Sequence, residues 1–311
     1  MNPFKYGQVV GNEDFCPRPE LIKQLIGFAK SGQNVVLQIE RRMGKTSLVH
    51  EAFGRTQNFQ MIYIDLLEIK TTDDLCRRML KAIISVENQA GKLEKLVKSL
   101  SRLRPTISLD SFSGQPTVFL DPRISLQPDS IESVLDLIYD MNKQRPVIVV
   151  FDEFQDVLNL PDSSQVLALL RSKIQLQGEI AYVFSGSIRN DMRDIFLNAD
   201  SPFFKSATTL DVHALQEDEF IAFLKAKFRK GKRKISNETL NQIIFIGDTV
   251  PGDIQELCGA LWDTSSQGES ISESHFQKAF ELIFSREASH HCRQNFWKEW
   301  ESHILLQYKR P

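Results

Sequence analysis

The chain has 311 residues, of which 41% are hydrophobic and 25% charged, a composition typical of a folded globular protein with about two domains. It carries 38 lysines and arginines against 40 acidic residues, so no strong overall positive charge points to nucleic acid. Its four cysteines are far apart and form no CxxC pair, which argues against a zinc module or a disulfide framework. The longest apolar runs are too short to cross a bilayer, and we expect a cytoplasmic protein without membrane contact.

The first part of the chain alternates between short apolar runs and amphipathic stretches. Residues 20–30 have helical spacing, residues 35–39 form a predicted strand, and a second helix opens after Gly44. A further strand at residues 61–66 precedes a helix at residues 75–86. This alternation predicts βαβ units around a parallel sheet.

Prolines gather in residues 104–130, which predicts an inserted loop or hairpin there. A helix at residues 131–141 follows. The runs at residues 146–151 and 180–184 are fully apolar, like strands buried in the middle of a parallel sheet. A last short strand is predicted at residues 208–212.

From His213 onward the alternation of predicted strands and helices stops. Helical periodicity recurs at residues 217–228, 237–245, 251–262 and 272–284. We therefore predict an α/β core domain over residues 1–210 and a smaller all-helical domain over residues 211–311.

A phosphate-binding motif follows the first predicted strand. Gly44 lets the backbone approach phosphate oxygens, Lys45 places an ammonium group on the β and γ oxygens, and the hydroxyl of Thr46 can ligate Mg²⁺. The full P-loop pattern, G-x-x-x-x-G-K-[ST], has a glycine where this chain has Ile39. The motif nevertheless joins an apolar strand to a helix, which is the context that it requires. We predict that ATP phosphates bind to Arg42, Met43, Gly44, Lys45, Thr46 and Ser47.

An acidic pair, Asp152 and Glu153, ends the most apolar strand. In a P-loop ATPase the first carboxylate holds Mg²⁺ through its water shell, and the adjacent glutamate deprotonates the attacking water. We assign Asp152 and Thr46 to the metal and Glu153 to the base, with a solvated strand end as the alternative. Ser187, after the next strand, is a candidate contact to the γ-phosphate or the attacking water, unless it only forms a turn.

These segments resemble the archaeal-type ATPase family of the STAND and AAA-like P-loop NTPases. The resemblance is carried by residues 2–7 (NPFKYG) with Phe15 and Arg18, by residues 41–48 (RRMGKTSL) and by residues 151–155 (FDEFQ). It implies a five-stranded parallel ATPase core, a helical lid and the use of ATP to switch conformation or to drive a partner. It also implies that the N-terminal block lies against the adenine, which makes Tyr6, Val9 and Val10 candidates for the base pocket. Ordinary packing beneath the first helix is the alternative for these three residues.

The chain departs from the family pattern in three places. Ile39 replaces the first loop glycine, so slow or absent turnover stays open as an alternative to efficient hydrolysis. Lys205 and Ser206 stand where the family often has Gly-Arg, so we do not expect an arginine from that place to reach a neighbouring subunit's γ-phosphate. The chain stops at Pro311, and we expect no complete winged helix after the helical domain.

A basic run near one predicted helix end is a candidate contact to nucleic-acid phosphates, with a solvated helix C-terminus as the alternative. It consists of Lys225, Lys227, Arg229, Lys230, Lys232, Arg233 and Lys234. The sequence thus predicts an Mg²⁺-dependent ATPase that acts as a conformational switch or motor for a protein partner, and a nucleotide-dependent homo-oligomer is kept open. The alternatives are a nucleotide-sensing scaffold with little or no hydrolysis and a nucleic-acid-associated ATPase.

Overall fold

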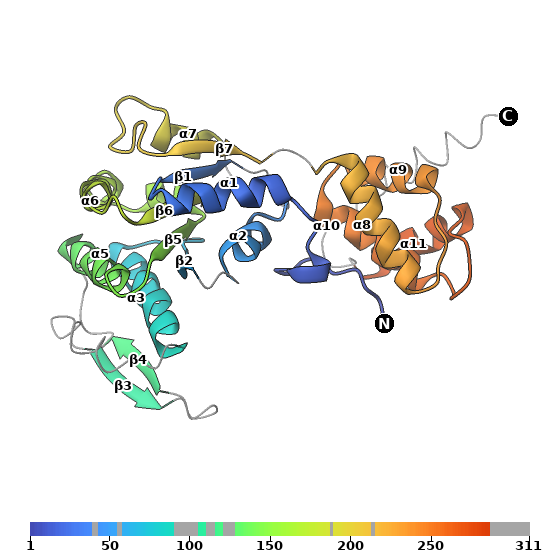
Figure 1. Ribbon diagram of the computed structural model, residues 1–311, viewed down its shortest axis with the longest axis horizontal. Helices are drawn as coiled ribbons and strands as arrows, with labels where there is room; N and C mark the ends of the chain where they lie inside the picture. Colours follow the sequence, from blue (N-terminus) through green and yellow to red (C-terminus); the bar gives the residue numbers. More distant parts are fainter. Residues whose placement is uncertain are drawn as a thin grey trace. The chain divides into compact units, whose positions relative to one another are not determined.

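The computed structural model describes residues 1–38, 43–54, 58–89, 105–109, 116–120, 128–186, 189–212 and 215–286 (Figure 1). The chain divides into two compact units. The helical unit consists of Met1–Pro19, Arg42–Leu48 and His213–Pro311, and the sheet unit consists of Glu20–Arg41 and Val49–Val212.

The sheet unit is built on five parallel strands in the order β2-β5-β6-β1-β7. Their bounds are β1 (Val35–Gln38), β2 (Gln60–Asp65), β5 (Val147–Asp152), β6 (Ala181–Gly186) and β7 (Thr208–Asp211). All six residues of β5 and of β6 are buried, whereas the edge strands β2 and β7 alternate between more and less buried positions. Inner strands are covered on both faces, which explains why their sequences are continuously apolar. The predicted α/β fold with a parallel sheet is confirmed.

Amphipathic helices precede, connect and flank these strands. They are α1 (Pro19–Lys30), α2 (Lys45–Phe53), α3 (Thr72–Gln89), α5 (Pro128–Asn142), α6 (Ser163–Leu176) and α7 (Arg189–Phe196), and short 3-10 turns lie at η1 (Asn12–Asp14) and η3 (Phe154–Asn159). Helices α3, α5 and α6 lie side by side (Figure 1). The apolar faces of these helices and the sheet share one core, in which the ring centroids of Phe154 and Phe184 lie 4.7 Å apart with the rings tilted by 55°.

A two-stranded antiparallel hairpin, β3 (Pro105–Leu109) with β4 (Pro116–Leu120), lies within the stretch predicted as an inserted loop or hairpin. Pro105 and Pro116 each occupy the first position of their strand. Proline is tolerated there because the strand can begin without its N–H group.

The helical unit contains α8 (Glu217–Lys230), α9 (Asn237–Ile246), α10 (Pro251–Asp263) and α11 (Glu273–Arg286) (Figure 1). Helix α10 is buried along nearly its whole length and packs against α9 and α11. None of the helices among the described residues is long and apolar enough to cross a membrane.

The first residues of the chain belong to the helical unit, although the sequence assigns them to the core domain. The ring of Phe4 lies 4.8 Å from that of Phe228 and 6.2 Å from that of Trp262. The side-chain amide of Asn2 donates to the Gly259 carbonyl of α10 at 2.9 Å. These contacts depend on residues more than two hundred positions away, which local sequence patterns do not reveal.

Candidate nucleotide site

The carboxyl edge of the sheet gathers polar side chains from neighbouring strands. Asp65 of β2 is in register with Asp152 of β5, and Phe151 is in register with Phe184, so that Asp152 and Ser185 follow at adjacent positions. Only β6 separates β5 from β1, the strand that leads to the P-loop motif. In open parallel sheets, ligands bind outside this edge, close to the point where the strand order reverses.

Asp152 is buried and accepts hydrogen bonds at both of its carboxylate oxygens. The hydroxyl of Ser185 donates to Oδ1 at 2.7 Å, the backbone N–H of Glu153 donates to the same oxygen at 3.0 Å, and the hydroxyl of Tyr63 donates to Oδ2. Such donors hold a carboxylate in one orientation. Asp152 therefore presents a fixed negative charge at the end of β5.

Two neighbours of Asp152 were not singled out by the sequence. Tyr63 lies on β2, and the ring of His50 on α2 lies 5.1 Å from the Tyr63 ring. Burial lowers the pKa of His50, and the nearby charge of Asp152 opposes this effect. No motif marks either residue: the pairing of β2 with β5 brings Tyr63 close to Asp152, and His50 lies against Tyr63.

Glu153 has a left-handed backbone, with φ 52° and ψ 44°. This conformation is uncommon for a residue other than glycine, and such residues are found most often at functional sites. The Gln155 amide donates to Oε2 of Glu153 at 2.7 Å and to Oδ1 of Asp156 at 3.2 Å. Gln155 is itself buried, so it limits the positions that the Glu153 carboxylate can adopt.

Gly186, the last residue of β6, leaves room for the Gln155 side chain. A Cβ atom added to Gly186 would lie 2.3 Å from Oε1 of Gln155 and 2.7 Å from Sδ of Met192. The glycine is thus required by close packing around the residue that contacts Glu153.

The P-loop motif has the local geometry of a strand-to-helix turn. Gly44 has φ +78°, a conformation that favours glycine, and α2 begins at Lys45. The first helical turn closes with the Leu48 N–H donating to the Gly44 carbonyl at 2.9 Å. The N–H groups in the first turn of a helix point outward from its N-terminus, which is the arrangement that binds phosphate there.

The N-terminal residues contact the helical unit and the P-loop motif. The Val10 N–H donates to Oγ of Ser47 at 3.1 Å, and Nη2 of Arg18 donates to the Met43 carbonyl at 3.0 Å. The Tyr6 ring packs against Gly259 of α10. Three of the residues singled out by the sequence, Ile39, Arg42 and Ser187, lie outside the described part of the chain.

Oxygen-donor side chains in this set suit magnesium. Mg²⁺ binds hard oxygen ligands and usually takes one or two carboxylates together with phosphate oxygens and water. The Asp152 carboxylate and the Thr46 hydroxyl each carry an oxygen donor of this kind. No group of three or more His, Cys, Asp or Glu side chains that could hold a metal ion occurs among the described residues, so a dedicated all-protein metal cage is absent from this part of the chain.

Part of the basic run has structural partners within the helical unit. Lys227 is only 4% exposed, and its ammonium group donates to the Pro3 carbonyl and to Oδ1 of Asp14, both at 2.7 Å. Arg229, Lys232 and Lys234 are exposed. The surface charge of the run is therefore smaller than its sequence suggests.

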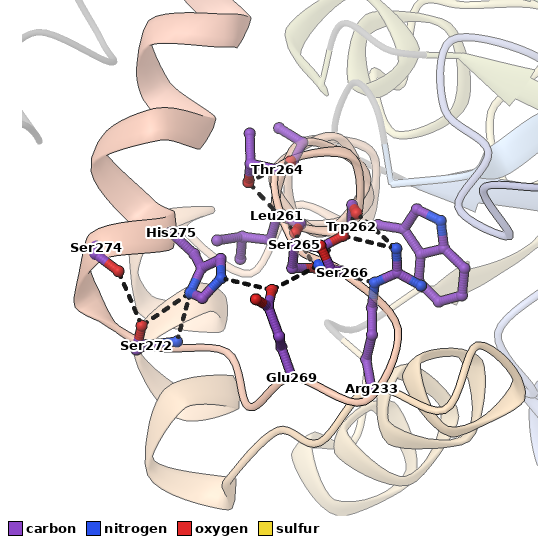
Figure 2. Close-up of polar contacts among 11 residues, drawn as sticks. Arg233, Leu261, Trp262, Thr264, Ser265, Ser266, Glu269, Ser272, Ser274 and His275 are labelled. Carbon is purple, nitrogen blue, oxygen red and sulfur yellow. Dashed lines mark hydrogen bonds and ion pairs between the residues drawn. The ribbon is translucent and has the colours of Figure 1, made fainter.

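Arg233 of the same run braces the end of α10 (Figure 2). Its guanidinium lies 3.8 Å from the Trp262 ring centroid and donates to the carbonyls of Trp262 and Ser265 at 3.1 and 2.8 Å. In the following loop, Glu269 accepts the Ser266 N–H at 2.6 Å and lies 3.4 Å from Nε2 of His275. The bond from Ser266, aided by His275, lowers the pKa of Glu269.

The parallel sheet, the P-loop turn and the acidic strand end define the P-loop ATPase class of folds. Residues 15–257 match the family described as an ATPase domain predominantly from Archaea, and the chain belongs to this family. The family resemblance expected from the sequence is thereby confirmed. No curated protein matches the chain in sequence.

Several solved structures share the fold of this chain. The chain is similar to the Walker-type ATPase PABY2304 of Pyrococcus abyssi, with 18% identity and a TM-score of 0.65, over 97% of this chain and 80% of that one. It is similar to the Aeropyrum pernix Orc1 protein, solved in complex with DNA, with 10% identity and a TM-score of 0.59, over 88% and 66%. It is also similar to Cdc6p from Pyrobaculum aerophilum, with 14% identity and a TM-score of 0.54, over 90% of this chain and 70% of that one. At these identities the likeness shows a common fold.

Proposed function

We propose that this chain binds ATP with Mg²⁺ and hydrolyses it to ADP and phosphate, and that the cycle serves as a conformational switch or motor for a protein partner. The observation that carries the proposal is the end of β5, where Asp152 is held by Ser185 and Tyr63 and is followed by the strained Glu153. Membership of an ATPase family supports it. The helical unit would act as the lid. Within the described residues, Cys16, Cys76 and Cys258 are buried and free, which suits the reducing cytoplasm.

Each residue of the motif has a role in this proposal. The amides of Arg42, Met43, Gly44 and Ser47 would bind phosphate oxygens, and Lys45 would neutralise the β and γ phosphates. Tyr6 and Val10 would contact the adenine ring. Thr46 and Asp152 would hold Mg²⁺, which lowers the charge of the phosphates when bound.

Hydrolysis needs one proton transfer that the chain can provide. The water oxygen bonds to the γ-phosphorus, the bond to the β–γ bridging oxygen breaks, and ADP leaves with the electron pair. The Glu153 carboxylate would accept the proton of the water, while Gln155 keeps the carboxylate in place. Ser187, after β6, would contact the γ-phosphate or the water.

Phosphate release under multiple turnover tests this proposal. Wild-type chain should release phosphate in the presence of Mg²⁺, and Glu153→Gln should lower the rate by about 100-fold or more while ATP still binds, because a general base contributes factors of this size. Glu179→Gln, at an exposed glutamate of the sheet unit, is the matched control and should keep the wild-type rate. Equal rates for wild type and Glu153→Gln would contradict the assignment.

Two other functions have specific support. Ile39 in place of the first loop glycine favours a nucleotide-sensing scaffold, for which wild-type chain would bind ATP but release no phosphate above the Glu153→Gln background. The exposed Arg229, Lys232 and Lys234, together with the DNA complex of the similar Orc1 structure, favour a nucleic-acid-associated ATPase. That function requires turnover that responds to added DNA at low salt. A nucleotide-dependent homo-oligomer fits any of the three.

A further inference from the structure

The N-terminal segment, Met1–Pro19, contacts the P-loop motif at two points on either side of Lys45. Before the lysine, Nη2 of Arg18 donates to the Met43 carbonyl at 3.0 Å. After it, the Val10 N–H donates to Oγ of Ser47 at 3.1 Å. Met43 and Ser47 are both buried. The contacts thus bracket the residues that are proposed to bind phosphate.

The Arg18 contact orients the amide of Gly44. The Met43 carbonyl and the Gly44 N–H belong to the same peptide unit, which is trans, so the two groups point in opposite directions. A donor fixed on the carbonyl therefore fixes the direction of the N–H group on the other side. Gly44 has φ +78°, and because glycine has more backbone freedom than any other residue, a contact on the Met43 carbonyl adds a restraint to this peptide.

The Arg18 side chain is partly buried, and one of its donor atoms is fully enclosed. In the part of the chain that the structure describes, its Nη1 is buried without a hydrogen-bond partner. Burial lowers the pKa of Arg18, although an arginine still stays charged. Burying a charged group costs free energy, and the hydrogen bond to the Met43 carbonyl offsets part of this cost.

The segment is itself fixed to the helices at its other end. Lys227 of α8 donates to the Pro3 carbonyl and to Asp14, and the ring of Phe4 packs on that of Phe228. All of these residues and the P-loop motif belong to the helical unit. The contacts of Arg18 and Val10 therefore come from an anchored segment.

We propose that Arg18 is a positioning residue for the phosphate loop, with Val10 as a second point of the same clamp, in a chain that lacks the first loop glycine. Arg18 acts through the Met43 carbonyl and sets the direction of the Gly44 N–H. The inference rests on the proposed ATP site and adds to it a contact outside the motif that shapes its phosphate-binding amides.

Hydrogen exchange of the chain without nucleotide tests the clamp. The readout is the amide of Leu48, which donates to the Gly44 carbonyl and so reports the position of Gly44. Arg18→Met should raise its exchange rate by about tenfold, and Arg18→Lys, which can still donate to Met43, should restore most of the protection. The amides of β5 should not change. Arg145→Met is the matched control, because Arg145 is exposed and also donates to a backbone carbonyl, that of Phe59.

Calorimetry with two ligands distinguishes an effect of Arg18 on the phosphate loop from a contact between Arg18 and adenine. Arg18→Met should lower the affinities for ATP and for inorganic tripolyphosphate by the same factor, about tenfold or more, because both ligands bind the loop amides. An unchanged exchange rate of the Leu48 amide would overturn the proposal. A loss of affinity for ATP without a loss of affinity for tripolyphosphate would overturn it as well. Where Arg18→Met fails to fold, Val10→Pro removes the donor to Ser47 and should raise Leu48 exchange in the same way; no change would overturn the clamp. Exchange needs no ligand, so a wild-type chain that binds no ATP refutes the proposed function without deciding the clamp.

Discussion

The carboxylate of Asp152 depends on side chains that lie far from it in the sequence. Ser185 and Tyr63 come from the two strands that flank β5, and each donates one hydroxyl to this carboxylate. Glu153 depends in the same way on Gln155, and Gln155 depends on the absence of a side chain at Gly186. The proposed chemistry thus requires close packing behind the residues that would meet ATP.

Gly186→Ala is expected to destabilise the chain by about 2 kcal/mol, because the new methyl group meets Gln155 Oε1 at 2.3 Å and overpacks a buried site. The displaced Gln155 should also release the Glu153 carboxylate and slow phosphate release. Urea denaturation measures the first effect. Gly27→Ala is the control: Gly27 lies within α1 with open space around it, and alanine there should be neutral or slightly stabilising. Equal stability of Gly186→Ala and wild type would refute the packing argument.

The N-terminal segment is attached to α8 by a lysine that is nearly inaccessible to solvent. Lys227 donates to Asp14, and Lys5 also forms an ion pair with this acid at 2.9 Å. Burial raises the pKa of Asp14, but the hydrogen bonds from Lys227 and Lys5 outweigh it, so the pKa lies below its ordinary value. A lowered pKa in the folded chain means that the ionised acid stabilises the fold.

Asp14→Asn should therefore cost about 1 kcal/mol at neutral pH, a value reduced for the partial exposure of this pair. The stabilisation by Asp14 is present above its unfolded pKa of about 4 and is lost as the pH falls through the lower folded pKa. Wild type and Asp14→Asn should converge in acid. Urea denaturation at neutral pH and near pH 3, monitored by hydrogen exchange of the α10 amides, measures the difference in the free energy of unfolding between the two proteins. Glu13→Gln, at a fully exposed neighbouring acid, should have no comparable effect, and a pH-independent cost of Asp14→Asn would contradict the ionic account.

Sequence patterns predicted whole elements better than the contacts between them. The strands at residues 146–151 and 180–184 are found as Val147–Asp152 and Ala181–Gly186, because a strand covered on both faces must be apolar throughout. The acidic pair at the end of the first of these strands could be recognised for the same reason. Tyr63, His50 and Lys227 could not, because each is placed by an encounter with a distant segment. The basic run shows the same limit, because its charge pattern did not indicate that Lys227 is buried.

In the molecule as a whole, the strand order connects the separate motifs. Strands β5, β6 and β1 are adjacent and parallel, so the acidic pair, Ser185 and the start of the P-loop connection all follow strands that end at one edge of the sheet. Membership of an archaeal ATPase family agrees with this arrangement. We propose that the residues after β1 bind the phosphates of ATP.

Calorimetric titration of the full chain with ATP and Mg²⁺ tests that claim most directly. Wild type should bind, and Lys45→Ala should reduce the affinity by at least about 100-fold, because the lysine neutralises charge that backbone amides alone cannot. Lys143→Ala, which removes an exposed lysine paired only on the surface with Asp140, is the control and should bind like wild type. If Lys45→Ala binds ATP as tightly as wild type, the nucleotide site lies elsewhere and the account is wrong.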